Sequence, residues 1–249
     1  IEKHIIGLIA LNAFLKLFSN LAGKKILVHG GGKRATNIAS KLGIESKMID
    51  GRRITDAETL KVITMVYGGL VNKDIVVKLQ ALHVDAIGLT GADINSIKSE
   101  KRPVKDIDFG FAGDVKEVAS NSIDKLIKAD FTPVFCAITH DGNGQLLNTN
   151  ADTIASTIAV GMSKIYETSI YYCFELNGVL QDFDNKKSVI KSINSEIYKE
   201  LLANDIITDG MIPKLDNCFD ALKNGVSKVH IGNSSMLTVE NEFFTTITI

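Results

Sequence analysis

The sequence has few of the features that mark disulfide-rich, metal-binding or nucleic-acid-binding proteins. Its three cysteines, Cys136, Cys173 and Cys218, are odd in number and far apart, which favours neither a disulfide framework nor a metal pair. We therefore expect a protein of the reducing cytoplasm. A net charge of −1 provides no clustered positive charge for nucleic acid or an anionic membrane, so we expect neither as a partner.

Long hydrophobic runs and low-complexity linkers are also lacking. Residues 5–15 are mostly apolar, but Asn12 and Lys16 end this run well short of the length that spans a membrane. Neither a basic region nor a small-residue cleavage site accompanies it, which argues against a signal peptide. The run is better explained as a strand over 4–10 followed by a helix over 11–21.

The rest of the chain alternates strand and helix patterns. Further predicted strands lie at 25–29, 86–90, 109–115, 132–138, 167–174, 228–231 and 245–249. Predicted helices lie at 34–42, 70–82, 122–129, 153–162, 195–204 and 214–224. Such alternation predicts an α/β protein with a mainly parallel central sheet covered on both faces, a three-layer αβα sandwich. We expect two lobes, 1–162 and 163–249.

The segment 25–33 predicts a strand, a tight loop of three glycines and the start of a helix. Glycines let backbone N–H groups approach an anion, and the N-terminal end of a helix adds partial positive charge. The loop is therefore either a cradle for phosphate or another developing negative charge, or a turn that only requires glycine. It matches neither the P-loop nor the dinucleotide-binding pattern.

Two arginines and a helix start follow the glycine loop. Segment 47–55 predicts a hairpin with an Asp50-Gly51 turn, and segment 98–105 an exposed basic turn. An arginine fork matches the two oxygens of a carboxylate, whereas a solvated hairpin tip is the better interpretation for Arg52. Thr55 is expected to cap a helix that runs toward the glycine pair at 68–69.

Two later segments also carry polar groups at predicted helix starts. In segment 148–152, Asn150 is either a simple cap or part of a set that holds a substrate amide and orients catalytic lysines. In segment 209–214, Pro213 suits a first helical turn, but Lys214 does not, because cations favour the opposite helix end. A lysine placed there points to an anionic ligand or to solvent.

Four segments taken together resemble the N-acetylglutamate kinases of the amino acid kinase family. They are 26–32 (Ile-Leu-Val-His-Gly-Gly-Gly), 51–55 (Gly-Arg-Arg-Ile-Thr), 147–152 (Leu-Asn-Thr-Asn-Ala-Asp) and 207–214 (Ile-Thr-Asp-Gly-Met-Ile-Pro-Lys). Their type, order and approximate spacing agree with the family over residues 24–229. The resemblance shifts the glycine loop from a bare turn to a binding site.

The resemblance implies transfer of the γ-phosphoryl group of ATP, with Mg²⁺, to the side-chain carboxylate of an N-acylated glutamate in arginine biosynthesis. The acyl group is acetyl, with succinyl also open. The first lobe would bind the acyl-glutamate and form a homodimer, and the second lobe would bind ATP. Alternatives are a related kinase acting on free glutamate or carbamate, or a catalytically inactive ligand-binding homologue.

The resemblance also implies a role for individual residues. Gly31 and Gly32 would contact the substrate and stabilise the transferring phosphoryl group, with Gly31 counted among the catalytic residues. Arg53 would clamp the α-carboxylate, and Asn148 would bond the substrate near it. Asp152 would orient catalytic lysines, and Lys214 would be a catalytic cation that also contacts the nucleotide. The implied nucleotide loop, altered from the usual aspartate-containing version, contributes Glu175, Asn177 and Gly178. No residue is assigned to a resident metal.

One departure from the family lies at the first predicted strand. There the family has a Lys-x-Gly-Gly loop with a catalytic lysine, whereas residues 4–11 contain no lysine and only one glycine. The spacing to His29 is also shorter. Either a mobile loop is missing from the sequence, or the protein has lost it. Arginine-inhibited members of the family carry an extra helix before this strand. Because the given sequence begins almost at the predicted strand, we expect a dimer that arginine does not inhibit.

Overall fold

The computed structural model describes residues 2–49, 52–207, 211–238 and 243–249. Contacts divide the chain into two compact units. The central unit is Ala22–Ile154, and the terminal unit combines Ile1–Leu21 with Ala155–Ile249. The division falls a few residues before the lobe boundary expected at 162–163. The assignment of acyl-glutamate binding to one lobe and ATP binding to the other stays a prediction.

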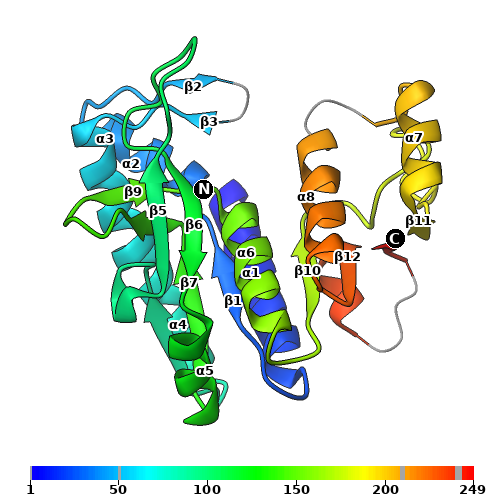
Figure 1. Ribbon diagram of the computed structural model, residues 1–249, viewed down its shortest axis with the longest axis horizontal. Helices are drawn as coiled ribbons and strands as arrows, with labels where there is room; N and C mark the ends of the chain where they lie inside the picture. Colours follow the sequence, from blue (N-terminus) through cyan, green and yellow to red (C-terminus); the bar gives the residue numbers. More distant parts are fainter. Residues whose placement is uncertain (1, 50–51, 208–210, 239–242) are drawn as a thin grey trace. The chain divides into compact units, whose positions relative to one another are not determined.

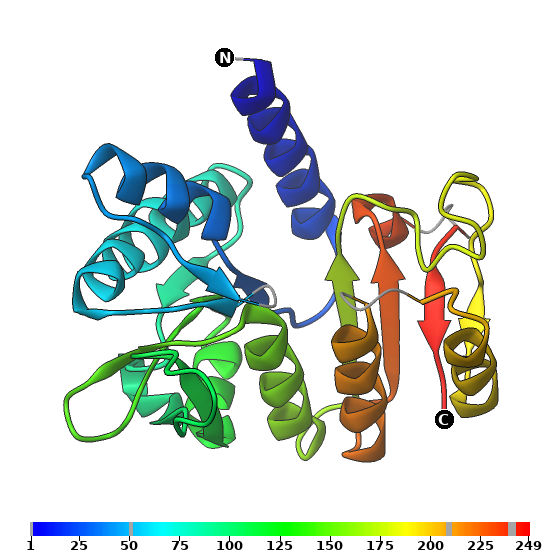
Figure 2. The same ribbon diagram turned by 90° about the horizontal axis from the view of Figure 1, so that it is seen from above.

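The core of the central unit is a parallel three-stranded sheet in the order β1 (Leu27–His29), β7 (Thr132–Cys136), β4 (Ala86–Leu89). All five residues of β7 are buried, as expected for a central strand covered on both faces. Helices α2 (Gly32–Lys41) and α4 (Asn72–Gln80) cover one face, and α5 (Ser120–Lys128) covers the other (Figure 2). The unit therefore has three layers, helix, sheet and helix.

A long helical run crosses one face of this sheet. It consists of α3 (Ala57–Ile63), the π-helical segment η1 (Thr64–Val71) and α4, with no break between them. The two expected helices are thus one continuous run, and the glycine pair lies inside it. Its N-cap is Asp56, whose side chain accepts a hydrogen bond from the Thr59 N–H at 2.8 Å. The prediction that Thr55 is the cap is wrong.

A second sheet of the central unit has the order β6 (Gly113–Val118), β5 (Ile97–Lys101), β8 (Ile138–His140), β9 (Leu146–Asn148). Figure 1 shows β5 and β6 running side by side. The expected hairpin is confirmed as β2 (Met48–Ile49) paired with β3 (Arg52–Arg53), while its Asp50-Gly51 turn lies outside the described residues. The short helix η2 (Asp93–Asn95) follows β4.

The terminal unit is built on a four-stranded sheet in the order β10 (Ser169–Cys173), β12 (Lys228–Gly232), β13 (Thr245–Ile247), β11 (Ser192–Ile193). Strands β10 and β12 are parallel, and β13 is antiparallel to β12. Helices α7 (Ser195–Ala203) and α8 (Ile212–Lys223) complete a core that contains Leu215, Phe219 and Ile231. Helix α1 (Glu2–Asn20) contacts the short helix η3 (Ser234–Leu237). Helix α6 (Ala151–Ser163) begins in the central unit and continues into this one.

The strand expected over 4–10 is wrong, because α1 continues through it. A strand that turns into a helix needs turn residues, and residues 2–20 contain no proline and only Gly7. The leucines, alanines and lysines of this segment are good helix formers. The expectation of arginine insensitivity, which depended on a strand at this place, loses its basis.

Two other expectations need correction. The exposed turn expected over 98–105 is wrong at its start, where residues up to Lys101 belong to β5 and pair with β6. The strand expected over 109–115 begins only at Gly113 and extends to Val118. In β5 the charged residues occupy a strand because Ile97 and Ser99 alternate with them toward the buried face. The α/β fold with a three-layer, mainly parallel core is confirmed.

Candidate active site

The glycine loop joins the end of β1 to the start of α2. His29 ends the strand, Gly31 is the N-cap of the helix, and the first helical bond runs from the Ala35 N–H to the Gly31 carbonyl at 2.9 Å. The preceding N–H groups are those that a helix leaves without an intrahelical partner. No acidic residue lies in the first turn of α2. The positive end of the helix is therefore available to an anion.

Close packing explains why position 31 is a glycine. A Cβ at Gly31 would lie 2.8 Å from Cδ1 and 2.9 Å from Cε1 of Tyr67, and 3.5 Å from Val71. The Gly31 φ of 169° lies outside the left-handed region that favours glycine, so close packing and not a left-handed backbone explains the glycine. The Tyr67 ring thus presses directly on the loop backbone. Burial raises the pKa of Tyr67, and the nearby Arg53 opposes this shift.

Arg53 lies against the same loop. Its side chain is buried, and Nη2 donates to Thr36 Oγ1 at 2.8 Å and to the Gly32 carbonyl at 3.2 Å. The neighbouring Arg52 is exposed, as expected for a hairpin tip. A buried guanidinium beside a helix N-terminus places two sources of positive charge together, which suits a ligand that carries carboxylate or phosphoryl oxygens.

Asn148 is connected to Arg53 through Thr55. The Asn148 Nδ2 donates to Thr55 Oγ1 at 3.0 Å, and that hydroxyl donates to the Arg53 carbonyl at 3.2 Å. Thr55 is fully buried, and its backbone pairs with Phe109 and Phe111. This pairing explains why Thr55 is not a helix cap. It also holds two of the predicted substrate-binding residues in one hydrogen-bonded chain.

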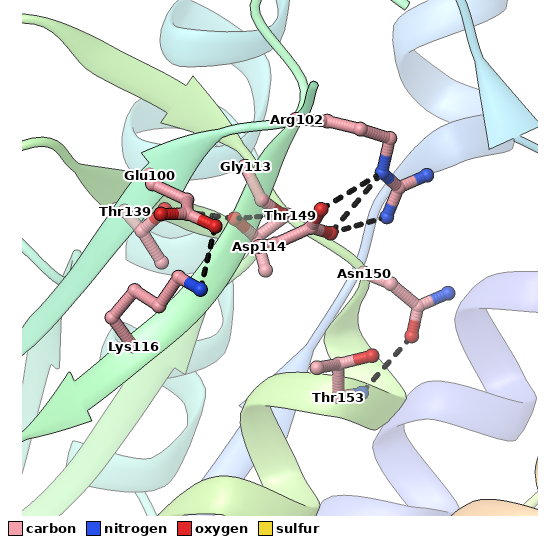
Figure 3. Close-up of polar contacts among 9 residues, drawn as sticks. All are labelled: Glu100, Arg102, Gly113, Asp114, Lys116, Thr139, Thr149, Asn150 and Thr153. Atoms are coloured by element: carbon pink, nitrogen blue, oxygen red, sulfur yellow. Dashed lines mark hydrogen bonds and ion pairs between the residues drawn. The ribbon is translucent and has the colours of Figure 1, made fainter. Parts of the chain in front are cut away.

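The start of α6 lies next to the glycine loop. A Cβ at Gly30 would lie 3.8 Å from the Cβ of Ala151, and Asp152 follows in the first turn of α6. Asn150 is the helix cap, because its side chain accepts a hydrogen bond from the Thr153 N–H at 3.0 Å (Figure 3). The prediction that Asn150 caps the helix is therefore confirmed. The role of Asp152 in orienting catalytic lysines stays a prediction.

In the central unit, the paired strands β5 and β6 are joined by ion pairs of their own. Figure 3 shows Arg102 paired with Asp114 and Lys116 paired with Glu100, both across the two strands. The guanidinium of Arg102 also lies 5.5 Å from the ring centroid of Phe109. These contacts pair four of the charges on the two strands and support their antiparallel pairing.

The predicted nucleotide loop lies in the terminal unit, where β10 ends. Phe174 N–H donates to the Gly232 carbonyl at 2.9 Å, and Asn233 Nδ2 donates to Asn177 Oδ1 at 2.5 Å. A Cβ at Gly178 would lie 2.6 Å from Thr245 Oγ1, so this glycine is needed for close packing. The loops after β10 and β12 thus meet at the carboxyl ends of parallel strands, where α/β proteins bind ligands.

Lys214 lies in the first turn of α8. Its ammonium group is 4.8 Å from the ring centroid of Tyr172, so the aromatic face stabilises a cation at the unfavourable end of a helix. The preceding part of this motif, residues 208–210, lies outside the described residues. Glu175, two residues beyond β10, is exposed.

The structure thus brings Gly31, Gly32, Arg53 and Asn148 together in the central unit. In the terminal unit it groups Asn177 and Gly178 with the loop after β12. Sequence reasoning missed several residues that support these groups: Thr36, Tyr67, Asn233 and Asn72, whose amide nitrogen lies 3.1 Å from His29 Nε2 at the end of β1. The run of glycines indicated that a bulky side chain packs against the loop. Nothing in the sequence identified that side chain as Tyr67.

Comparisons with known proteins agree with this geometry. The model of the amino acid kinase family matches residues 6–233. The chain belongs to the amino acid kinase family. It is 57% identical over 229 residues to an acetylglutamate kinase of Cytophaga hutchinsonii, covering 92% of this chain and 87% of the relative. An acetylglutamate kinase of Phocaeicola vulgatus is 56% identical over 227 residues, covering 91% and 88%. The resemblance drawn from the four motifs is confirmed.

Solved structures share the fold. An N-acetylglutamate synthase from Neisseria gonorrhoeae, complexed with coenzyme A and N-acetyl-glutamate, has a TM-score of 0.81 at 18% identity, covering 96% of this chain and 56% of that one. A carbamate kinase from Giardia lamblia bound to AMP-PNP has a TM-score of 0.66 at 12% identity, covering 95% and 87%. At these identities the likeness shows the fold alone.

Two kinds of feature are absent from the part of the chain that the structure describes. None of the helices there is both long and apolar enough to cross a membrane. In the same part of the chain, no three histidine, cysteine, aspartate or glutamate side chains gather into a set that could hold a metal ion.

Proposed function

We propose that this kinase transfers the γ-phosphoryl group of ATP to the side-chain carboxylate of an N-acylated L-glutamate, in arginine biosynthesis. The observation that carries the proposal is the buried Arg53, bonded to the glycine loop and linked through Thr55 to Asn148. Relatives at 56–57% identity are named acetylglutamate kinases, which supports an acetylated acceptor. A succinylated acceptor is the closest variant.

On the acceptor side, Arg53 would bind the α-carboxylate and Asn148 would bond the substrate near it. Gly31 and Gly32 would direct backbone N–H groups at the transferring phosphoryl group. Phosphoryl transfer depends mainly on positioning and on stabilising charge on the phosphoryl oxygens. A helix N-terminus without acidic residues in its first turn supplies that stabilisation.

On the nucleotide side, Glu175, Asn177 and Gly178 would contact ATP from the loop after β10. Lys214 would neutralise charge on the phosphates, and its position at a helix N-terminus supports an anionic neighbour. Mg²⁺ would arrive bound to the phosphates of ATP, where it neutralises charge during phosphoryl transfer. Asp152, in the first turn of α6, would orient catalytic lysines.

The chemical step needs no strong base. The carboxylate of the acceptor is already ionised at neutral pH, so an oxygen of this group attacks the γ-phosphorus directly. The new bond joins that oxygen to phosphorus, and the bond between phosphorus and the β,γ-bridging oxygen breaks. The products are an acyl phosphate and ADP, and no proton is transferred.

A second candidate is a catalytically inactive binding protein of the same fold. The observation that favours it is α1, a continuous helix at the place where the family has a strand and a Lys-x-Gly-Gly loop. Such a protein would retain the Arg53 and glycine-loop contacts, bind acyl-glutamate and release no ADP. Binding and catalysis must therefore be measured separately.

We also propose a cytoplasmic homodimer. Exposed apolar side chains, Met65, Leu70 and Val77, lie along the run from η1 to α4, with exposed fractions of 51–63%. A second copy of the chain would cover them by helix-to-helix contact, which the adjacent Gly69 would bring close. The free thiols Cys136 and Cys173 suit a reducing compartment.

The proposal is tested by trapping the product. The purified protein is incubated with ATP, Mg²⁺ and N-acetylglutamate or N-succinylglutamate, and hydroxylamine converts any acyl phosphate to a hydroxamate that mass spectrometry identifies. We expect the hydroxamate of an N-acylated glutamate. If calorimetry detects acyl-glutamate binding while no hydroxamate forms, the inactive binding protein replaces the kinase as the conclusion.

A further inference from the structure

Three side chains from the π-helical segment η1 and the first residue of α4 point toward the glycine loop and the strand residue before it. In a π-helix the hydrogen bonds join residues five apart, so residues four and five apart lie on the same face. Tyr67, Val71 and Asn72 have this spacing. Tyr67 and Val71 contact Gly31, and Asn72 contacts His29, the residue that ends β1. Ordinary α-helical spacing would turn Tyr67 and Asn72 to different faces.

The amide of Asn72 has only one orientation that satisfies its neighbours. Its Nδ2 donates to the Val134 carbonyl at 2.9 Å, and its Oδ1 accepts from Lys73 Nζ at 3.3 Å. Asn72 is only 1% exposed, and Gly88 leaves the space that its amide oxygen occupies. Turning the amide over would place its oxygen against a carbonyl oxygen and its NH₂ against an ammonium group.

The fixed amide determines which nitrogen of His29 carries a proton. Asn72 Nδ2 lies 3.1 Å from His29 Nε2 and is a donor there, so Nε2 must be the acceptor. The proton of the neutral imidazole is then on Nδ1. Nδ1 lies 2.7 Å from the Gly30 carbonyl and donates to it. His29 therefore connects the buried amide to the first peptide of the glycine loop.

The groups around His29 favour the neutral imidazole. Cys136, its register partner on β7, has its pKa raised to about 12 by burial and stays a thiol. Tyr67 on η1 has its pKa raised by burial and stays a phenol. Lys73 on α4 is a cation whose ammonium reaches Asn72, and Asp93 acts on Cys136. Burial lowers the pKa of His29 itself, with the Gly30 hydrogen bond opposing.

The Gly30 carbonyl and the Gly31 N–H belong to one planar trans peptide, in which they point in opposite directions. A carbonyl tied to the imidazole of His29 therefore turns the Gly31 N–H away from the imidazole. We propose that His29 and Asn72 are a positioning pair that holds this N–H toward the bound anion. The identity of that anion as the transferring phosphoryl group rests on the proposed function.

The first test measures the pair without any reaction. The protein has five histidines, and ¹⁵N NMR of the imidazoles, assigned with His29→Gln, reports the tautomer and pKa of each. We expect His29 to be the Nδ1–H tautomer and to remain neutral below pH 6.5. Asn72→Ala is expected to remove the tautomer preference. An Nε2–H tautomer, or a normal pKa for His29 in the wild-type protein, would overturn the proposal.

The second test measures catalysis in two matched variants. The side-chain amide of His29→Asn can replace the Nδ1–H donor, whereas His29→Gln can replace only the Nε2 acceptor. We expect kcat to fall about 10- to 100-fold in His29→Gln, less than the about 10²- to 10³-fold cost of deleting an oxyanion donor, and far less in His29→Asn. KM for both substrates should change little. Equal losses in the two variants would contradict a positioning role.

The two tests separate the inference from the function on which it rests. A wild-type protein that makes no acyl phosphate refutes the proposed function, while the imidazole spectra still decide whether His29 and Asn72 form the pair. His230→Gln is the matched control, because His230 is a buried histidine of the terminal unit with a lowered pKa, and its Nδ1 lies 3.1 Å from Thr246 Oγ1 in the same unit. Its kcat should remain near that of the wild-type protein.

Discussion

At the scale of single residues, the site depends on side chains that surround the glycine loop. Arg53 and Tyr67 contact the loop from outside, and Thr55 links Arg53 to Asn148. Each of these side chains is buried or half-buried, so a substitution affects ligand binding through position as well as charge. The neighbouring Arg52 is exposed and offers an internal comparison.

Arg53→Ala should raise the KM for N-acylglutamate more than it lowers kcat. A hydrogen bond to a charged group contributes about 1.5–3 kcal/mol, which corresponds to roughly a 10- to 150-fold higher KM. Steady-state kinetics of Arg53→Ala and of the control Arg52→Ala measure this directly. A loss confined to kcat in Arg53→Ala, or an equal rise of KM in Arg52→Ala, would show that Arg53 does not hold the acceptor.

The stability of the protein should fall as the pH drops below about 6.5. Burial lowers the pKa of His29 and of His230, so the unfolded chain binds protons more tightly than the folded protein at these positions. Unfolding therefore becomes easier between the ordinary histidine value of 6.5 and the lower folded-state values. Urea unfolding at pH 7.5 and 5.5 measures the difference.

His29→Gln should reduce this pH dependence, because one of the two groups is removed. The expected result is a smaller decrease in the free energy of unfolding between the two pH values than in the wild-type protein. An unchanged difference would mean that His29 titrates normally in the folded protein.

At the scale of elements, the parallel strands of both cores and most helices follow from hydrophobic patterning. Segments 132–138, 195–204 and 214–224 match β7, α7 and α8 closely, because their apolar spacing agrees with their burial. Three features did not follow. Residues 4–10, expected as a strand, belong to a helix, because no turn residues separate them from the helical residues that follow. The π-helical conformation of η1 has no sequence signature. The helix cap is Asp56 instead of Thr55, because the backbone of Thr55 pairs with Phe109 and Phe111.

Asp56→Ala should destabilise the protein by about 1 kcal/mol, the usual cost of removing a helix N-cap. Asp56 is exposed, and its carboxylate accepts the Thr59 N–H, which lowers the pKa of Asp56. The KM values of the Asp56→Ala variant should stay near those of the wild-type protein. Chemical denaturation combined with steady-state kinetics gives both quantities.

Thr55→Val is the matched control for the cap. It keeps the shape of the side chain but removes the hydroxyl that accepts from Asn148 and donates to Arg53. We expect a raised KM for N-acylglutamate in this variant. If Thr55→Val leaves KM unchanged, the hydrogen-bonded chain from Arg53 to Asn148 has no role in binding.

At the scale of the whole molecule, the predicted site residues group within each compact unit. The acceptor-side residues belong to the central unit, and the nucleotide-side residues belong to the terminal unit. The glycine loop follows the parallel strand β1 and the nucleotide loop follows the parallel strand β10, whereas Arg53 and Asn148 lie in antiparallel strands. The supporting residues Tyr67, Asn72 and Asn233 come from other elements, and only the folded chain brings them to the motifs.

Leu70→Glu should convert the proposed homodimer into monomers. Leu70 is 51% exposed in the apolar set with Met65 and Val77, and a carboxylate buried at a helix-to-helix contact would be strongly unfavourable. Size-exclusion chromatography with light scattering measures the mass of the wild-type protein and of the variant. The control is Phe183→Glu, at an exposed side chain of the terminal unit. A wild-type monomer, or a Leu70→Glu dimer, would refute this interface.

The most direct test of the central claim is the rate of ADP release with ATP and Mg²⁺ and three possible acceptors: N-acetylglutamate, N-succinylglutamate and free glutamate. The account predicts rapid release with an N-acylated glutamate and little with free glutamate, because the acceptor side is built around Arg53 and Asn148. Absence of release with both acylated acceptors would contradict it.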